Sequence, residues 1–254
     1  MKGITKYIPN TLTCLSLSFG VYASILGISG DYYGAMFAIF IAAVFDFLDG
    51  FAARLFNAFS PIGKDLDSLS DMVSFGVAPG MMLFSFLDSL LHSYTSLDNI
   101  GVYKLFLLSA LAIPVLSALR LAKFNIDSRQ KTSFIGLPVP AHAIFWASLI
   151  AALSPYYMDY HLKIDSLFSN FLSGIPLIII VISLSALAFI SSLLLVSEIP
   201  MFSLKISSFA WKTARLQYIL IISAILLITF FGIIGITVTM LLYIFLSLFN
   251  PPKS

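Results

Sequence analysis

Residues 46–71 read DFLDGFAARLFNAFSPIGKDLDSLSD, a stretch that places five carboxylates inside an apolar region of the chain. The carboxylates belong to Asp46, Asp49, Asp65, Asp67 and Asp71. Only two cations, Arg54 and Lys64, accompany them. An ionised side chain at membrane depth is costly, so the surplus negative charge requires protonation, water or a metal ion. Clustered carboxylates without competing His or Cys are hard oxygen ligands, which favours Mg²⁺ or Mn²⁺.

Helical spacing brings most of these side chains onto two faces. At about 100° per residue, one face of a helix through residues 46–54 carries two carboxylates, two small residues and a cation. These are Asp46, Asp49, Gly50, Ala53 and Arg54. A second helix is predicted to begin with Ser60 as N-cap and Pro61 at its first position.

On this second helix, Gly63, Asp67 and Asp71 recur every four residues and share a face, whereas Asp65 points elsewhere. If the two helices are adjacent and antiparallel, their carboxylates converge near the cytoplasmic boundary of the membrane. The converging set is Asp46, Asp49, Asp67 and Asp71.

Four converging carboxylates can hold two metal ions about 3.5 to 4 Å apart, which suits phosphoryl transfer because the ions bridge phosphate oxygens. Gly50, Ala53 and Gly63 would then be small so that a nucleotide diphosphate can approach the helix backbones. Close helix packing explains small residues equally well. Both interpretations stay open at this point.

The composition places the whole chain in a lipid bilayer. Of 254 residues, 59% are hydrophobic and 10% are charged, against about 25% charged in an ordinary soluble domain. A net charge of +2 without any basic run argues against a nucleic-acid partner. The single cysteine, Cys14, excludes a disulfide framework, and we expect it to be buried as a small hydrophobe.

Spans of roughly 20 apolar residues divide the chain into about eight candidate transmembrane helices. They lie near residues 9–29, 33–54, 65–87, 102–122, 138–154, 174–196, 214–231 and 233–249. The run from Tyr218 to Phe249 is too long for one crossing, so we expect a tight hairpin near Gly232 and Gly235. The predicted fold is an all-α integral membrane protein, with residues 1–254 forming a single domain.

Basic residues near span ends mark the cytoplasmic side. With eight spans and an inside N-terminus, only Lys104 and Lys163 of the fourteen Lys and Arg residues fall outside. The sequence therefore predicts an N-in, C-in membrane protein. The active site is expected at the cytoplasmic side of the second and third helices.

The acidic stretch resembles a known signature at every position. It has the form Asp46-x2-Asp49-Gly50-x2-Ala53-Arg54-x8-Gly63-x3-Asp67-x3-Asp71, which is similar to the motif of the CDP-alcohol phosphotransferases. The resemblance implies transfer of a substituted phosphate from a CDP-alcohol to an acceptor hydroxyl, with release of CMP, at a site with two divalent cations. It also implies a homodimer whose active site opens to the cytoplasm.

The resemblance assigns roles by position. Asp46, Asp49 and Asp67 correspond to metal ligands, and Asp71 to a ligand that also acts as general base. Arg54 corresponds to a catalytic cation near the phosphates. The positions that contact CDP are Asp49, Gly50, Ala53, Gly63, Asp67 and, in a flanking segment, Asn10.

Flanking segments resemble those of bacterial and archaeal phosphatidylserine synthases, which implies CDP-diacylglycerol and L-serine as substrates. The matching segments are Ile8–Thr13, Asp71–Pro79, Ala118–Asn125, Phe134–Ala141, Val196–Ser197 and Phe202–Lys205. The carboxylate of serine needs a cation, and Arg suits two-point capture. The acceptor-binding candidates are Arg120, Lys123, Asn125, Lys131 and Lys205. Alternatively, the cations among these candidates do not bind serine: they are ordinary basic residues of the cytoplasmic side, or they contact lipid headgroups.

Two competing functions remain. Within the same reaction class, the acceptor could be glycerol phosphate, inositol phosphate or choline. Phosphorylated acceptors would favour a denser basic pocket than this chain shows. A transporter for cations or protons also places carboxylates in the membrane, but such a path distributes charge across depth rather than on two neighbouring helix faces.

Overall fold

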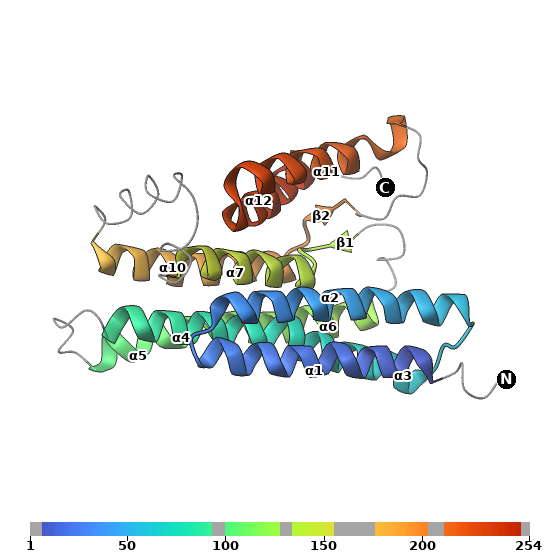
Figure 1. The fold of residues 1–254 in the computed structure, drawn as a ribbon, viewed down its shortest axis with the longest axis horizontal. Coiled ribbons are helices and arrows are strands. Elements are labelled where there is room, and N and C mark those ends of the chain that lie inside the picture. The colour runs from blue at the N-terminus through green and yellow to red at the C-terminus, as the bar shows by residue number, and fades with distance from the viewer. Residues whose placement is uncertain (1–6, 93–99, 128–133, 155–175, 203–210, 250–254) are drawn as a thin grey trace.

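A computed structural model describes residues 7–92, 100–127, 134–154, 176–202 and 211–249, which are almost entirely helical (Figure 1). The helices are α1 (Ile8–Ile28), α2 (Tyr32–Leu55), α3 (Pro61–Asp71), the π-helical η1 (Met72–Val77), α4 (Ala78–His92), α5 (Ile100–Ser109), α6 (Ala112–Ile126), α7 (Val139–Leu153), α10 (Leu177–Val196), α11 (Trp211–Phe231) and α12 (Ile233–Phe249). Two short strands, β1 (Phe134–Ile135) and β2 (Pro200–Met201), complete the described elements. The helices α1 to α6 form a bundle, α7 and α10 pack against one side of it, and α11 and α12 lie beyond these two.

Within the described ranges, six helical segments are long and apolar enough to cross a membrane. They are Ile8–Ile28, Tyr32–Leu55, Pro61–His92, Tyr103–Ile126, Leu177–Val196 and Ala214–Phe231. The apolar helices α7 and α12 are shorter. The chain is thus a multi-pass, helical membrane protein, while the count of eight spans and the N-in, C-in orientation stay predictions.

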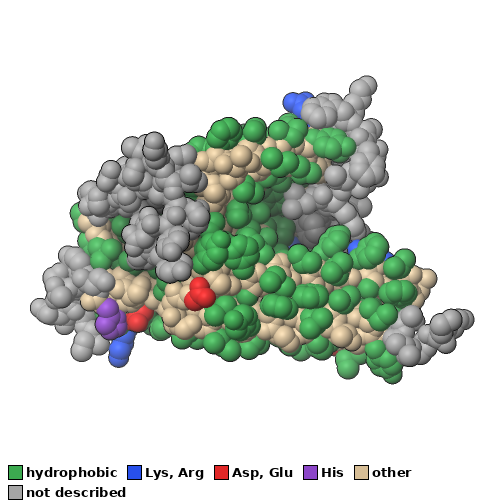
Figure 2. Space-filling view, viewed as in Figure 1, with side chains coloured by type: hydrophobic (Ala, Val, Ile, Leu, Met, Phe, Trp, Pro, Cys, Tyr) green, Lys and Arg blue, Asp and Glu red, His purple; other side chains and the backbone are tan. Residues whose placement is uncertain are grey.

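The surface supports the same conclusion. The face in Figure 2 is dominated by hydrophobic side chains and carries few charged ones. Cys14 is exposed, so the prediction that it is buried is wrong. In lipid, an apolar side chain gains little by moving inward, and small or polar residues occupy the helix contacts instead.

Helix α1 shows this arrangement clearly. Its buried face carries small or hydroxyl-bearing residues at intervals of three and four, among them Thr13, Ser16 and Gly20. The Ser16 hydroxyl donates to the carbonyl of Ala42 on α2, at 2.9 Å. A side chain at Gly20 would overlap Ser74 of η1. Helix α1 therefore packs closely against α2 and against η1, which directly follows the carboxylates of α3.

The third span is continuous from α3 through η1 into α4 but changes helical register after Asp71. In η1 the hydrogen bonds skip one extra residue, and the amide of Ala78 donates to the carbonyl of Val73. Pro79 follows, and it lacks the amide hydrogen that a regular helix would need there. A π-helical turn before a proline shifts the register without ending the helix.

The two short strands join the loops before α7 and after α10. They pair antiparallel, with Phe134 opposite Met201. Gly136 has a positive φ of 80° and lies against carbonyls of α10 and the loop after it, where a side chain would collide. This pair is the one departure from an all-α architecture in the described chain, and the sequence did not predict it.

The predicted C-terminal hairpin is confirmed. α11 ends at Phe231, Gly232 adopts a positive φ of 60°, and α12 begins at Ile233. A side chain at Gly235 would overlap the backbone of Leu227, so this glycine permits close contact between the two helices. α12 packs on α7, and the Tyr243 hydroxyl donates to the carbonyl of Phe202 at 3.1 Å.

Candidate metal and nucleotide site

The site forms where α2 and α3 meet at one end of the bundle. The Ser60 hydroxyl accepts a hydrogen bond from the Gly63 amide at 3.1 Å, and Pro61 occupies the first helical position. The predicted start of the second carboxylate-bearing helix is therefore confirmed. The loop from Phe56 to Ser60 is short, so the carboxylates late in α2 lie beside those of α3.

The structure brings the four predicted carboxylates together. Asp46, Asp49 and Asp67 each offer an oxygen within 4.8 Å of those of the other two. The carboxyl group of Asp71 lies next to that of Asp46, within hydrogen-bonding reach. Asp65 is exposed and lies outside the cluster, as the helical spacing predicts.

The chemistry of the cluster fits a divalent cation. Asp49 is 6% exposed, and one oxygen of Asp71 is buried without a hydrogen-bond partner. Within the described ranges, no Lys or Arg forms an ion pair with any of the four carboxylates. Uncompensated carboxylates this close together repel one another, and hard divalent cations such as Mg²⁺ or Mn²⁺ would remove that repulsion.

An open groove of about 230 Å³ adjoins the carboxylates. It is lined by Pro9, Asn10, Thr13, Asp49, Gly50, Ala53, Arg54, Ala58, Phe59, Ser60, Gly63, Lys64 and Asp67. All six residues predicted to contact CDP are among them. Of the others, Thr13, Phe59 and Lys64 were not predicted to be functional. The sequence feature that could have identified Thr13 is its place in the flanking segment Ile8–Thr13.

The two glycines of the signature lie in different surroundings. Above Gly50, the nearest atom to an added methyl group would be Arg54 Nη1 at 3.7 Å, so this backbone faces open space. At Gly63, the same methyl group would lie 2.9 Å from Asn10 Oδ1 and from Ser60 Oγ. Gly50 thus borders the groove without close packing against another helix, whereas contact with Asn10 of α1 contributes at Gly63.

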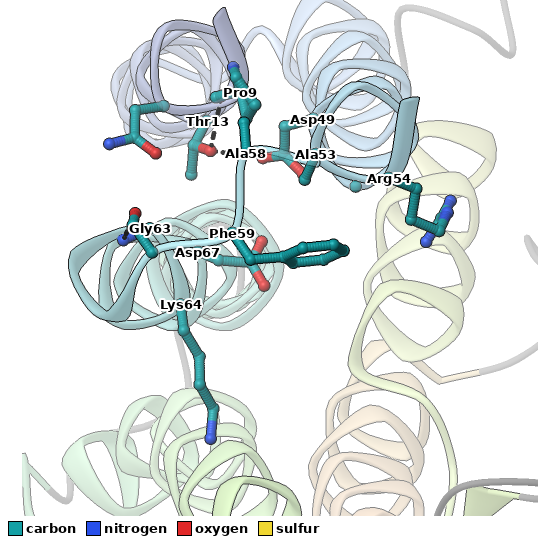
Figure 3. Close-up of a pocket in the computed structure, with 13 residues that line it drawn as sticks. Pro9, Thr13, Asp49, Ala53, Arg54, Ala58, Phe59, Gly63, Lys64 and Asp67 are labelled. Atoms are coloured by element: carbon teal, nitrogen blue, oxygen red, sulfur yellow. Dashed lines mark hydrogen bonds between the residues drawn. The ribbon is translucent and has the colours of Figure 1, made fainter. Parts of the chain in front are cut away.

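The two cations of the groove extend away from the carboxylates (Figure 3). Arg54 is exposed and lies on the side of α2 that faces away from Asp67. Lys64 donates a 3.3 Å hydrogen bond to the backbone carbonyl of Asn125 at the end of α6. The role of Arg54 near the phosphates stays a prediction.

The acceptor candidates on α6 differ in their surroundings. Arg120 is 3% exposed, and its guanidinium carbon lies 5.4 Å from the ring centroid of Phe124. Lys123 pairs with Glu198 at 2.5 Å. Asn125 donates to the Ser68 hydroxyl at 2.9 Å and so joins α6 to α3. Lys131 and Lys205 lie outside the described residues.

Comparison with known proteins agrees with this site. The family model of the CDP-alcohol phosphatidyltransferases matches residues 6–181, a range that contains every residue of the carboxylate cluster and the groove. α11 and α12 lie beyond the match.

Several curated proteins are similar to the chain. A CDP-diacylglycerol–serine O-phosphatidyltransferase of Bacillus subtilis is 39% identical over 135 residues, covering 53% of this chain and 70% of that protein. The enzyme of the same name from Methanocaldococcus jannaschii is 33% identical over 152 residues, 60% of this chain and 64% of that protein. An archaetidylserine synthase of Methanothermobacter thermautotrophicus is 33% identical over 166 residues, 62% of this chain and 64% of that protein.

The match over residues 6–181 includes the acidic signature that forms the cluster between α2 and α3. The chain is therefore a membrane-embedded transferase that belongs to the CDP-alcohol phosphatidyltransferase family.

Proposed function

We propose that this protein transfers a phosphatidyl group from CDP-diacylglycerol to the hydroxyl of L-serine and releases CMP. The observation that carries the proposal is the convergence of four carboxylates from α2 and α3 beside a groove lined by the small residues of the signature. The names of the similar proteins support serine as the acceptor.

Asp46, Asp49, Asp67 and Asp71 would hold two divalent cations, Mg²⁺ or Mn²⁺. When bound, such ions polarise phosphate oxygens and stabilise the charge that develops during phosphoryl transfer. Gly50 and Ala53 leave room beside these carboxylates for the nucleotide, and Asn10 and Gly63 line the same groove. Arg54, which also lines the groove, is the proposed cation for the departing CMP.

Asp71 is the general base in this proposal. Its buried oxygen without a hydrogen-bond partner is free to accept the proton of the serine hydroxyl. The serine oxygen then forms a bond to the phosphorus of the phosphatidyl group, and the bond from that phosphorus to the oxygen of CMP breaks. The proton stays on Asp71 until it passes to solvent.

Arg120 is our candidate for the serine carboxylate. It is the one buried cation among the Lys and Arg side chains that the structure describes. It lies on the same face of α6 as Ser117, which contacts Gly76 in the turn after Asp71. Lys123 is less buried than Arg120 and pairs with Glu198.

Replacing Arg120 with alanine should raise the serine KM by about 10- to 100-fold, the range expected when a hydrogen bond to a charged group is lost. The KM for CDP-diacylglycerol should change little. The measurement is CMP release at varied serine concentration, with Arg215→Ala as the matched control, because Arg215 on α11 is exposed. An unchanged serine KM would refute the assignment.

The proposed function is tested by incubating the purified protein with CDP-diacylglycerol and a panel of labelled acceptors. We expect labelled phosphatidylserine and stoichiometric CMP from serine, and no product from glycerol phosphate, inositol phosphate or choline. Preference for another acceptor would keep the reaction class but reject serine. A parallel assay with an ether-linked archaeal CDP-lipid compares the two lipid classes, because the relatives include an archaetidylserine synthase.

We also propose that the protein is a homodimer in a bacterial or archaeal cytoplasmic membrane, with its site open to the cytoplasm. The support is the family membership together with the basic residues predicted on that side.

A further inference from the structure

A side chain outside the acidic signature contacts the carboxylate cluster directly. The hydroxyl of Thr13 on α1 donates a hydrogen bond to Asp49 Oδ2 at 2.6 Å. Thr13 is 3% exposed and Asp49 is 6% exposed, so water competes little for this bond. The Pro9 carbonyl lies 3.0 Å from the same hydroxyl, but a carboxylate is the stronger acceptor. Figure 3 shows Thr13 and Asp49 facing each other across the α1–α2 contact.

The same residue is also tied to the other carboxylate-bearing helix. Ser70 of α3 donates to the backbone carbonyl of Thr13 at 3.3 Å. Ser70 is 1% exposed and lies between Asp67 and Asp71 in the sequence. One residue of α1 therefore contacts a carboxylate of α2 through its side chain and the acidic turn of α3 through its backbone.

These contacts matter because an aspartate carboxylate has little rotational preference of its own. Its terminal torsion has a broad energy minimum, so the direction of the oxygens must be fixed by neighbours. Hydrogen bonds from outside the ligand set commonly fix metal-binding side chains in this way, and their loss typically lowers metal affinity by about 10- to 100-fold.

We propose that Thr13 is a positioning residue for the divalent-metal site: its hydroxyl orients Asp49, and its backbone holds Asp49 at a fixed separation from the carboxylates of α3. This inference rests on the proposed function only in requiring that the carboxylates bind metal. It does not depend on the acceptor.

The test uses Thr13→Val, which keeps the shape of the side chain and removes the hydroxyl. We expect the Kd for Mn²⁺, measured by calorimetry on the purified full-length protein without substrate, to rise about 10- to 100-fold. Thr13→Ser retains the hydroxyl and should bind Mn²⁺ nearly as the unmodified protein does. At saturating Mn²⁺, the kcat of Thr13→Val should approach that of the unmodified protein, because the reacting groups are unchanged.

Thr11→Val is the matched control, since Thr11 is exposed on the same helix and, among the described residues, its hydroxyl bonds to the carbonyl of Tyr7 and not to a carboxylate. It should leave the Mn²⁺ affinity unchanged. Unaltered Mn²⁺ binding by Thr13→Val would overturn the proposal, as would a Thr13→Ser variant as defective as Thr13→Val. If the unmodified protein binds no Mn²⁺, the proposed metal chemistry fails as well, whereas a change of acceptor would leave the result for Thr13 intact.

Discussion

Replacing Asp71 with asparagine should abolish turnover while binding of the CDP-lipid largely survives. Asparagine keeps the size of the side chain and one oxygen, but it cannot accept the proton of the acceptor hydroxyl. Loss of a general base typically lowers the rate by about 10²- to 10⁴-fold. The measurement is CMP release in single-turnover and steady-state assays, together with direct binding of CDP-diacylglycerol.

Asp65→Asn is the control for this variant, because Asp65 is an exposed carboxylate on the same helix that lies outside the cluster. It should retain normal activity. If Asp71→Asn turned over at the normal rate, Asp71 would not be the base. If Asp71→Asn lost binding of the CDP-lipid together with turnover, its main role would be to form the binding site.

Removing divalent metal should reduce activity to the background level. The four carboxylates have no described cation to balance them, so without metal their negative charge repels the pyrophosphate of the substrate. The stabilisation that metals give to a phosphoryl-transfer transition state is worth several kcal/mol, which corresponds to a loss of about 10³-fold or more.

The measurement is CMP release after treatment with a chelator, followed by titration with Mg²⁺ or Mn²⁺. Activity should return with added metal in the unmodified protein and should require far more metal in Asp46→Ala and Asp67→Ala. Full activity in excess chelator would contradict both the metal site and the catalytic proposal built on it.

A transport function predicts a different outcome in the same experiments. A proton or cation path needs ionisable groups across the depth of the membrane, whereas the described cluster is confined to the second half of α2 and to α3. The buried contact between Ser148 and Thr237, at 2.8 Å, joins α7 to α12 and carries no charge. Turnover of a CDP-lipid that depends on Asp71 would decide for the transferase.

The sequence by itself determined the features that depend on the spacing of residues along one helix and on whether a segment is stable in lipid or in water. Because a long apolar run is stable only in lipid, it identified the chain as a multi-pass membrane protein and placed the hairpin at Gly232. Because residues three or four apart share a helix face, it also identified which carboxylates face one another. Ser60 and Pro61 marked the start of α3 for a local reason, the need to satisfy free amides at a helix end.

Only the tertiary structure decided which distant residues meet. Thr13 contacts Asp49 from another helix, and no local pattern predicts that contact. The packing of α6 likewise gives two cations of the same apolar segment different surroundings. Arg120 is buried, whereas Lys123 pairs with Glu198. Such pairings depend on how whole helices are placed against one another, which reflects the summed packing of many side chains rather than the spacing within any one helix.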